Sequence, residues 1–126
     1  MCFTTANNKR ALALAKRYGR KTDIIEIAKE IIEEQYRISA FTHPLCPLIT
    51  KNQSIEAANW GLIPHWVKAA DEAQKIRKIC LNARAETVFS LPAFRSPVIT
   101  KRCLIPATGY FEYHHREKAV IPYYIF

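Results

Sequence analysis

Proline and glycine punctuate this chain after Tyr36 so densely that long helices and long strands are excluded there. All seven prolines and two of the three glycines lie beyond that residue. Because proline lacks a backbone N–H and pushes the preceding residue toward extended conformations, short strands and loops are expected between these breaks. The candidate strands are Ile38–Thr42, Leu45–Thr50, Ser54–Trp60, Arg102–Ala107, Tyr110–His114 and Ile121–Phe126.

Helical periodicity is concentrated near the N-terminus. Over Thr22–Tyr36 apolar residues recur every three to four positions opposite a glutamate-rich face, which predicts an amphipathic helix. A shorter helix is predicted over Lys9–Tyr18, and it should end at Gly19 because glycine readily adopts the left-handed conformation of a helix C-terminus. Two further helices are expected at Val67–Lys78 and Ala85–Ser90.

These elements indicate one α+β domain over residues 1–126, with a helical hairpin over 8–36 followed by strands and helices over 37–126. The sheet is expected to be curved and mostly antiparallel, or an open barrel, with flanking helices. A chain of 126 residues can bury about two thirds of its unfolded surface, which suffices for one core. Because the apolar run Val120–Phe126 closes the sequence without polar residues, we expect the chain to be the N-terminal portion of a longer one.

The composition limits the class of protein. The chain has 19 basic and 11 acidic residues, a formal net charge of +8, which either solvates the surface or forms a face that attracts nucleic-acid phosphates. No apolar run approaches the ~20 residues of a membrane span, and no signal peptide is recognisable, so a soluble cytoplasmic protein is expected. The four cysteines form no C-x-x-C pair, so we expect reduced thiols, no metal and no cofactor.

Cys2 has the most distinctive potential chemistry. Once Met1 is removed, Cys2 carries a free α-amine beside its thiol, and both groups have nucleophilic fractions near neutral pH. The amine can condense with an aldehyde, and the thiol can then close a five-membered thiazolidine, which an internal cysteine cannot do. The alternative is that a small residue at position 2 has no chemical role.

Three other motifs contain candidate functional residues. Arg84, in the polar run Asn82–Thr87, could hold a phosphate with its planar guanidinium, although a solvated loop gives the same pattern. Glu112 lies among aromatic residues, where a carboxylate suits acid–base catalysis or simply an outward strand face. Trp60 and Trp66 could stack on bases of single-stranded nucleic acid or anchor a loop in the core.

Five motifs occur in an order that resembles a known family, the SOS response-associated peptidases (SRAP), also described as abasic-site-processing proteins. The resemblance covers Ile38 onward and the first two residues. The motifs are Met1-Cys2, Trp60-Gly-Leu-Ile-Pro-His-Trp66, Asn82-Ala-Arg-Ala-Glu-Thr87, Pro92-Ala-Phe-Arg95 and Arg102-Cys-Leu-Ile-Pro-Ala-Thr-Gly-Tyr-Phe-Glu-Tyr113.

The resemblance implies an SRAP-like fold and a sensor of abasic sites in single-stranded DNA. It implies that Cys2, exposed by removal of Met1, cross-links to the lesion as a thiazolidine during the DNA damage (SOS) response. Self-peptidase and lyase chemistry would share this site, and in a bacterium the protein would associate with the nucleoid. By the same resemblance, Asn82 orients the reacting sugar, Arg84 holds the DNA backbone and Glu112 is the acid–base group. The implied DNA-binding residues are Arg84, Trp60, Trp66, Arg95 and Tyr113.

The chain also departs from the family pattern. Phe3 and Thr4 stand where members commonly have Gly-Arg, so one DNA-contacting arginine is absent, and Tyr113 replaces a tryptophan. A His-x-Arg-Met-Pro motif that supplies a catalytic histidine has no counterpart, and cross-linking by residues 2–126 alone is therefore expected to be weak or absent. Two alternatives remain open: a thiol peptidase acting in trans, and a non-catalytic module that binds single-stranded DNA.

Overall fold

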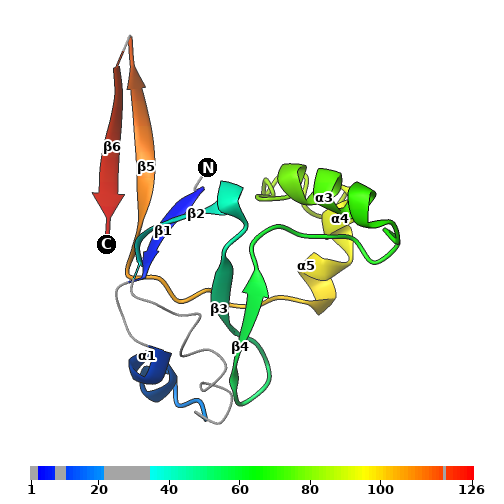
Figure 1. Ribbon diagram of the computed structural model, residues 1–126, viewed down its shortest axis with the longest axis horizontal. Helices are drawn as coiled ribbons and strands as arrows, with labels where there is room; N and C mark the ends of the chain where they lie inside the picture. The colour runs from blue at the N-terminus through cyan, green and yellow to red at the C-terminus, as the bar shows by residue number, and fades with distance from the viewer. Residues whose placement is uncertain (1–2, 8–10, 22–34, 118) are drawn as a thin grey trace.

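The computed structural model describes residues 3–7, 11–21, 35–117 and 119–126. Its strands form two antiparallel sheets, a four-stranded sheet in the order β2-β1-β5-β6 and a two-stranded sheet of β3 and β4 (Figure 1). Among the described strands neither sheet closes into a barrel, which confirms the predicted α+β class with an open antiparallel sheet. The strands are β1 (Thr4–Asn7), β2 (Gln35–Ser39), β3 (Leu45–Ile49), β4 (Ile55–Asn59), β5 (Gly109–Arg116) and β6 (Ala119–Ile125).

The described helices are short and lie mostly beside the two-stranded sheet (Figure 1). Two of them begin with a proline, which suits the first helical position because its missing N–H has no partner to lose there. The helices are α1 (Ala11–Arg17), the 3₁₀ turn η1 (Ala40–Thr42), α3 (Ala70–Ile79), α4 (Pro92–Arg95) and α5 (Pro97–Thr100).

Helix α1 ends as the sequence predicts. Gly19 has a φ of +60°, the left-handed conformation. The amide of Arg20 donates to the Ala15 carbonyl at 2.8 Å, and the amide of Gly19 donates to Lys16 at 3.3 Å. This pair of bonds is the Schellman motif, which satisfies carbonyls that the helix itself leaves without partners.

The hairpin of β5 and β6 is fixed by its turn and by one glycine. Arg116 pairs with Ala119, so two residues make the turn, and Glu117 has a φ of +49° as a tight hairpin turn requires. At the other end, a Cβ on Gly109 would lie 2.5 Å from Cζ of Tyr124 and 2.6 Å from the carbonyl oxygen of Ile125. Only glycine therefore lets β6 pass this close to the start of β5.

The two sheets are linked through the segment that precedes β5. The backbones of Ile49 in β3 and Leu104 exchange two hydrogen bonds, each 2.9 Å long, and so attach the segment before β5 to the smaller sheet. Most buried apolar residues have small or medium side chains, and Ile55 is the largest one that is fully enclosed. The buried apolar residues of the described part are Ala6, Ala15, Ile38, Ala40, Cys46, Ile49, Ile55, Cys80 and Leu81.

Near the N-terminus, pairing in the sheet overrides the local sequence pattern. Residues 22–34 of the predicted helix Thr22–Tyr36 lie outside the described residues, so the helical hairpin stays a prediction there. The helix prediction is wrong at Gln35 and Tyr36, which lie in β2. The predicted strand Ile38–Thr42 ends early, because the chain turns into η1 at Ala40. β2 pairs with β1, a four-residue strand too short to give a recognisable sequence pattern.

Two predictions in the second half of the chain are also wrong. Arg102–Ala107 is not a continuous strand, because only Leu104 forms a bridge. Ala85–Ser90 forms successive turns, and the α-helices follow at α4 and α5. The remaining predicted strands and the helix predicted at Val67–Lys78 are found with ends shifted by up to three residues.

Candidate nucleic-acid site

The start of β1 is held in place by contacts of Phe3. The carbonyl of Phe3 accepts a hydrogen bond from the Ala40 amide at 2.8 Å, and its ring stacks on Phe41 with 5.1 Å between centroids. β1 continues between β2 and β5, with Thr5 opposite Tyr110. Cys2 lies outside the described residues. Phe3, which follows it in the chain, is anchored at one end of the four-stranded sheet.

Glu112 and Tyr113 lie on β5, beside β1. Glu112 is half-buried and stands opposite Tyr123 of β6. Both residues line an open groove of about 470 Å³, together with His114, Tyr123, Tyr124 and Ile125. In the antiparallel register that pairs Thr5 with Tyr110, Glu112 lies two residues further along β5, in the direction of Phe3.

Arg37 belongs to the same sheet, and sequence reasoning missed it. Its Nη2 donates a hydrogen bond of 3.3 Å to the hydroxyl of Tyr113, linking β2 to β5 across the central strand β1. The residue is exposed, so its guanidinium is accessible to an anion. No sequence motif indicates the contact between Arg37 and Tyr113, because the two residues are 76 positions apart.

Trp60 is anchored by hydrogen bonds to several loops. Its indole Nε1 donates to the Leu81 carbonyl at 2.9 Å, and its backbone amide donates to Pro44 at 2.9 Å. Its own carbonyl accepts from His43 Nδ1 at 3.0 Å and from Arg77 Nε at 3.4 Å. This half-buried tryptophan therefore fixes the loop after β4, and His43 and Arg77 are positioning residues that the sequence patterns did not indicate.

Asn82 lies close to Trp60 in the fold. Both line a mostly apolar cavity of about 310 Å³, to which Phe94 and the chain after β4 also contribute. Asn82 is half-buried and directly follows the buried Leu81, whose carbonyl holds the Trp60 indole. The structure thus brings two of the predicted residues together here, while Glu112 and Tyr113 line a separate groove.

The other predicted DNA-binding residues are exposed. Arg84 lies at the start of the turns that follow Asn82, and its carbonyl accepts hydrogen bonds from the amides of residues 87 and 88. Arg95 is the last residue of α4. Trp66 is 46% exposed, with its ring edge-on to His65 at 5.2 Å. Its exposed face distinguishes it from the anchored Trp60.

The described cysteines differ in accessibility. Burial raises the pKa of both the Cys46 and the Cys80 thiol, so these two groups stay protonated and unreactive at neutral pH. Cys103 is exposed. None of the three carries a free α-amine, because all of them are internal.

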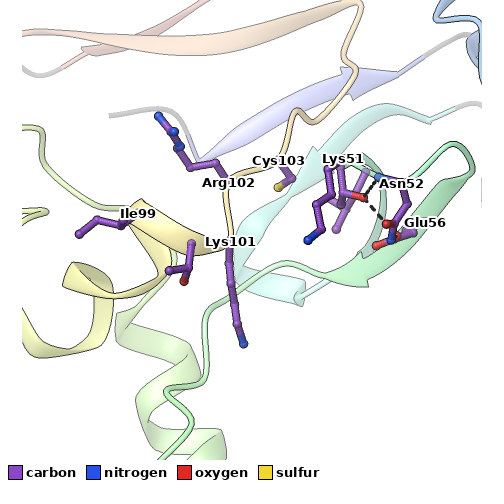
Figure 2. Close-up of a pocket in the computed structure, with 10 residues that line it drawn as sticks. Lys51, Asn52, Glu56, Ile99, Lys101, Arg102 and Cys103 are labelled. Carbon is purple, nitrogen blue, oxygen red and sulfur yellow. Dashed lines mark hydrogen bonds between the residues drawn. The ribbon is translucent and has the colours of Figure 1, made fainter.

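A basic cavity lies beside the turn that joins β3 to β4. It has a volume of about 530 Å³, and its rim carries Lys51, Lys101 and Arg102 (Figure 2). Its acidic residue, Glu56, accepts hydrogen bonds from Asn52 and Thr50. Figure 2 shows the side chains of Lys101 and Arg102, neighbours in the chain, pointing to opposite sides. The cations outnumber the carboxylate, so this surface favours an anion.

Within the described ranges, no helix has the length and apolarity needed to cross a bilayer. In the same part of the chain, His, Cys, Asp and Glu side chains do not form a group of three or more that could hold a metal ion.

The fold and these cavities define a class: an open antiparallel α+β protein with aromatic and basic residues along its grooves. A family model described as SOS response associated peptidase (SRAP) matches residues 1–126. The chain belongs to this family, which confirms the resemblance.

Relatives share this sequence over part of their length. The abasic site processing protein YoaM of Bacillus subtilis is 46% identical over 72 residues, covering 56% of this chain and 30% of its own. YoqW, with the same description and organism, is 38% identical over 109 residues, covering 79% and 47%. A crystal structure of a Bacteroides thetaiotaomicron protein superposes with a TM-score of 0.93 at 48% identity, covering 98% of this chain and 53% of that one. The chain thus spans about half the length of these longer matches.

Proposed function

We propose that this chain serves in the processing of abasic sites in single-stranded DNA, and that it captures the lesion covalently through Cys2 after Met1 is removed. One observation carries the proposal: Phe3, the neighbour of Cys2, is anchored on the end of β1 toward which Glu112 of β5 extends. The names of the Bacillus relatives support abasic sites as the substrate.

The proposed reaction uses both nucleophiles of Cys2. The open-chain abasic sugar presents an aldehyde at C1′, and the Cys2 amine adds to it to form a carbinolamine. Loss of water gives an imine, and addition of the thiol to the imine carbon closes the thiazolidine while the thiol proton passes to the ring nitrogen. The net change is the loss of one water molecule, so no oxidant or cofactor is required.

Glu112 is proposed to move the protons in this sequence. A protonated carboxyl can protonate the departing hydroxyl of the carbinolamine, and the resulting carboxylate can accept the proton of the attacking thiol. Its half-buried place on β5 supports this role, because the surrounding strands fix its backbone. A positioned acid–base group accelerates such steps by about 10²–10⁴-fold.

The other predicted residues are proposed to bind the single-stranded DNA. Asn82 would orient the sugar, with Trp60 fixing the loop beside it, because both line one cavity. Trp66 and Tyr113 offer exposed rings for base stacking, which is worth about 1–3 kcal/mol per base. Arg84, Arg95 and the rim of the basic cavity would contact phosphates.

The damage-response setting and the peptidase chemistry also belong to this proposal. We infer that the protein acts in the SOS response, and that self-processing at the N-terminus exposes Cys2. Lyase activity would follow from the same imine, because an imine at C1′ makes elimination of the 3′ phosphate easier.

The test compares an abasic with an intact single-stranded oligonucleotide, using protein whose mass shows that Met1 is absent. We expect a heat-stable adduct with the abasic strand alone, visible on a denaturing gel. The Cys2→Ala variant should lose this adduct, whereas Cys103→Ala, which removes an exposed internal thiol, should keep it. A Cys2→Ser variant should give an adduct only after borohydride reduction, because its amine still forms the imine.

Other outcomes point to the alternatives. Adduct yields unchanged by Cys2→Ala would overturn the mechanism. Equal, salt-sensitive binding of intact and abasic strands without an adduct would indicate a non-catalytic module. Turnover of peptides in the absence of DNA would indicate a thiol peptidase acting in trans.

A further inference from the structure

Arg37 is a cation of the four-stranded sheet that has no part in the function proposed above. Its Nη2 donates a hydrogen bond of 3.3 Å to the hydroxyl of Tyr113, and both residues are exposed. β1 separates their strands, which therefore lie about 10 Å apart. The two long side chains must extend over β1 to meet, so the guanidinium is held above the strand that begins at Thr4, next to Phe3.

The register of the sheet places Arg37 and Tyr113 on one face. Thr5 is paired with both Ile38 and Tyr110, so these three residues share a face. Because side chains alternate along a strand, Arg37, one residue before Ile38, belongs to the other face. Tyr113, three residues after Tyr110, belongs to that other face as well. The hydrogen bond between the two side chains therefore agrees with the pairing of all three strands.

The bond to Tyr113 positions the guanidinium without neutralising it. A tyrosine hydroxyl accepts a hydrogen bond but carries no charge, so the positive charge of Arg37 stays available to an anion. A guanidinium has five N–H donors in a planar fork, and this bond uses one of them. The remaining donors can hold two oxygens of a phosphate at once, and a fork already held in place loses less freedom when it binds.

We propose that Arg37 and Tyr113 form a phosphate subsite for single-stranded DNA. In this subsite Arg37 binds the phosphodiester, and the Tyr113 hydroxyl holds the guanidinium in position. The inference rests on the proposed function, because that function supplies the single strand whose phosphate is bound. Tyr113 joins the subsite to the rest of the site, since it also lines the groove that contains Glu112.

The subsite is suited to a phosphate that flanks the lesion. Glu112 directly precedes Tyr113 and therefore belongs to the opposite face of β5. A phosphate on Arg37 thus lies across the sheet from the proposed acid–base group and contributes to binding, not to proton transfer. Arg37 should lower the protein concentration needed to capture an abasic strand and should leave the rate at saturating protein unchanged.

Fluorescence anisotropy of the full chain with an intact single-stranded oligonucleotide, measured at several salt concentrations, tests the inference. Arg37→Gln should weaken binding about tenfold in low salt, because one charge-assisted contact is lost. It should also reduce the slope of log affinity against log salt by about 0.7. Arg37→Lys should keep the slope and lose part of the affinity, because an ammonium group keeps the charge but has no planar fork.

The matched control is Arg17→Gln. It removes the same charge from an exposed residue of α1, and it should change the affinity by less than about twofold, because salt screens isolated surface charges. Urea midpoints close to that of wild type verify that each variant is folded.

Tyr113→Phe separates phosphate binding from support of the ring. This variant keeps the aromatic ring and removes only the hydroxyl, so the salt slope should stay at the wild-type value. Affinity should fall about threefold, because the guanidinium is no longer held in place. Adding Tyr113→Phe to Arg37→Gln should cost little more, since no cation remains to be positioned.

A second readout uses protein that lacks Met1 and an abasic strand. Arg37→Gln should raise the protein concentration for half-maximal adduct by about the factor found with the intact strand, at an unchanged maximal rate. A lower maximal rate would overturn the assignment of Arg37 to a flanking phosphate.

Two results of the binding experiment overturn the inference alone. One is wild-type affinity and wild-type salt slope in Arg37→Gln. The other is an equal loss in Arg37→Gln and Tyr113→Phe with both slopes unchanged, which would make Arg37 only a support for the tyrosine ring. Wild-type protein that binds no single strand would contradict the proposed function together with this inference, so the two failures are distinguishable.

Discussion

Replacing Gly61 by alanine should destabilise the loop that positions Trp60. Gly61 has a φ of +111°, a conformation that residues with a Cβ rarely adopt, and such strain costs about 1–3 kcal/mol. A Cβ here would also lie 2.7 Å from Cγ of Arg77 and 3.1 Å from Nδ1 of His43. Relieving that crowding adds about 1–3 kcal/mol. The total expected loss in free energy of unfolding is therefore about 2–6 kcal/mol.

The crowding also affects the hydrogen bonds of the loop. Arg77 donates from Nε to the Trp60 carbonyl and from Nη2 to the His43 carbonyl, so a displaced side chain weakens both bonds. Because Trp60 and Asn82 line the same cavity, the substitution should also alter this part of the candidate site. The indole emission of Trp60 should shift accordingly.

The matched control is Gly19→Ala. Gly19 also has a positive φ, +60°, but nothing lies within 4 Å of a Cβ built there. This variant should lose only the cost of the left-handed conformation, about 1–2 kcal/mol. Urea unfolding followed by circular dichroism and tryptophan fluorescence measures both losses from the shift in midpoint at constant slope.

A double variant isolates the steric part of the effect. Arg77→Ala removes the Cγ that the new methyl group would meet, so Gly61→Ala should cost less in that background than in wild type. The reasoning is refuted if Gly61→Ala loses no more stability than Gly19→Ala, or if the two substitutions at Gly61 and Arg77 are strictly additive.

Four further predictions follow, two from the thiols, one from the anchored indole and one from the charge. Iodoacetamide followed by peptide mapping should modify Cys103 much faster than Cys46 and Cys80. Burial raises the pKa of the Cys46 and Cys80 thiols from the ordinary value of 9.0. The contribution of these protonated thiols to the free energy of unfolding is therefore full below about pH 9 and is lost as the pH rises beyond it. Urea midpoints between about pH 7 and 10.5 measure this loss. Trp60→Phe leaves the buried Leu81 carbonyl without its donor and should cost about 1–3 kcal/mol in thermal or urea unfolding. If the three cations of the basic cavity bind phosphates, affinity for intact single-stranded DNA should fall about 20-fold between 50 and 200 mM salt, measurable by fluorescence anisotropy.

Local sequence determined several features of this protein. Gly19 ends α1 because only a short-range conformational preference is involved. The spacing of prolines limited the second part of the chain to short strands, and the order of five motifs identified the family. The chemistry available to Cys2 also follows from its position next to Met1, without reference to any fold.

Tertiary structure decided what depends on pairing between distant segments. β1 has too few residues for a periodic pattern, yet it occupies the centre of the sheet and turns Tyr36 from a predicted helix into a strand. Arg37 meets Tyr113, and Arg77 meets the Trp60 carbonyl, only because long-range packing brings them together. The exposed faces of β6 likewise became evident only in the fold, because an apolar strand has the same sequence pattern whether it is covered or not.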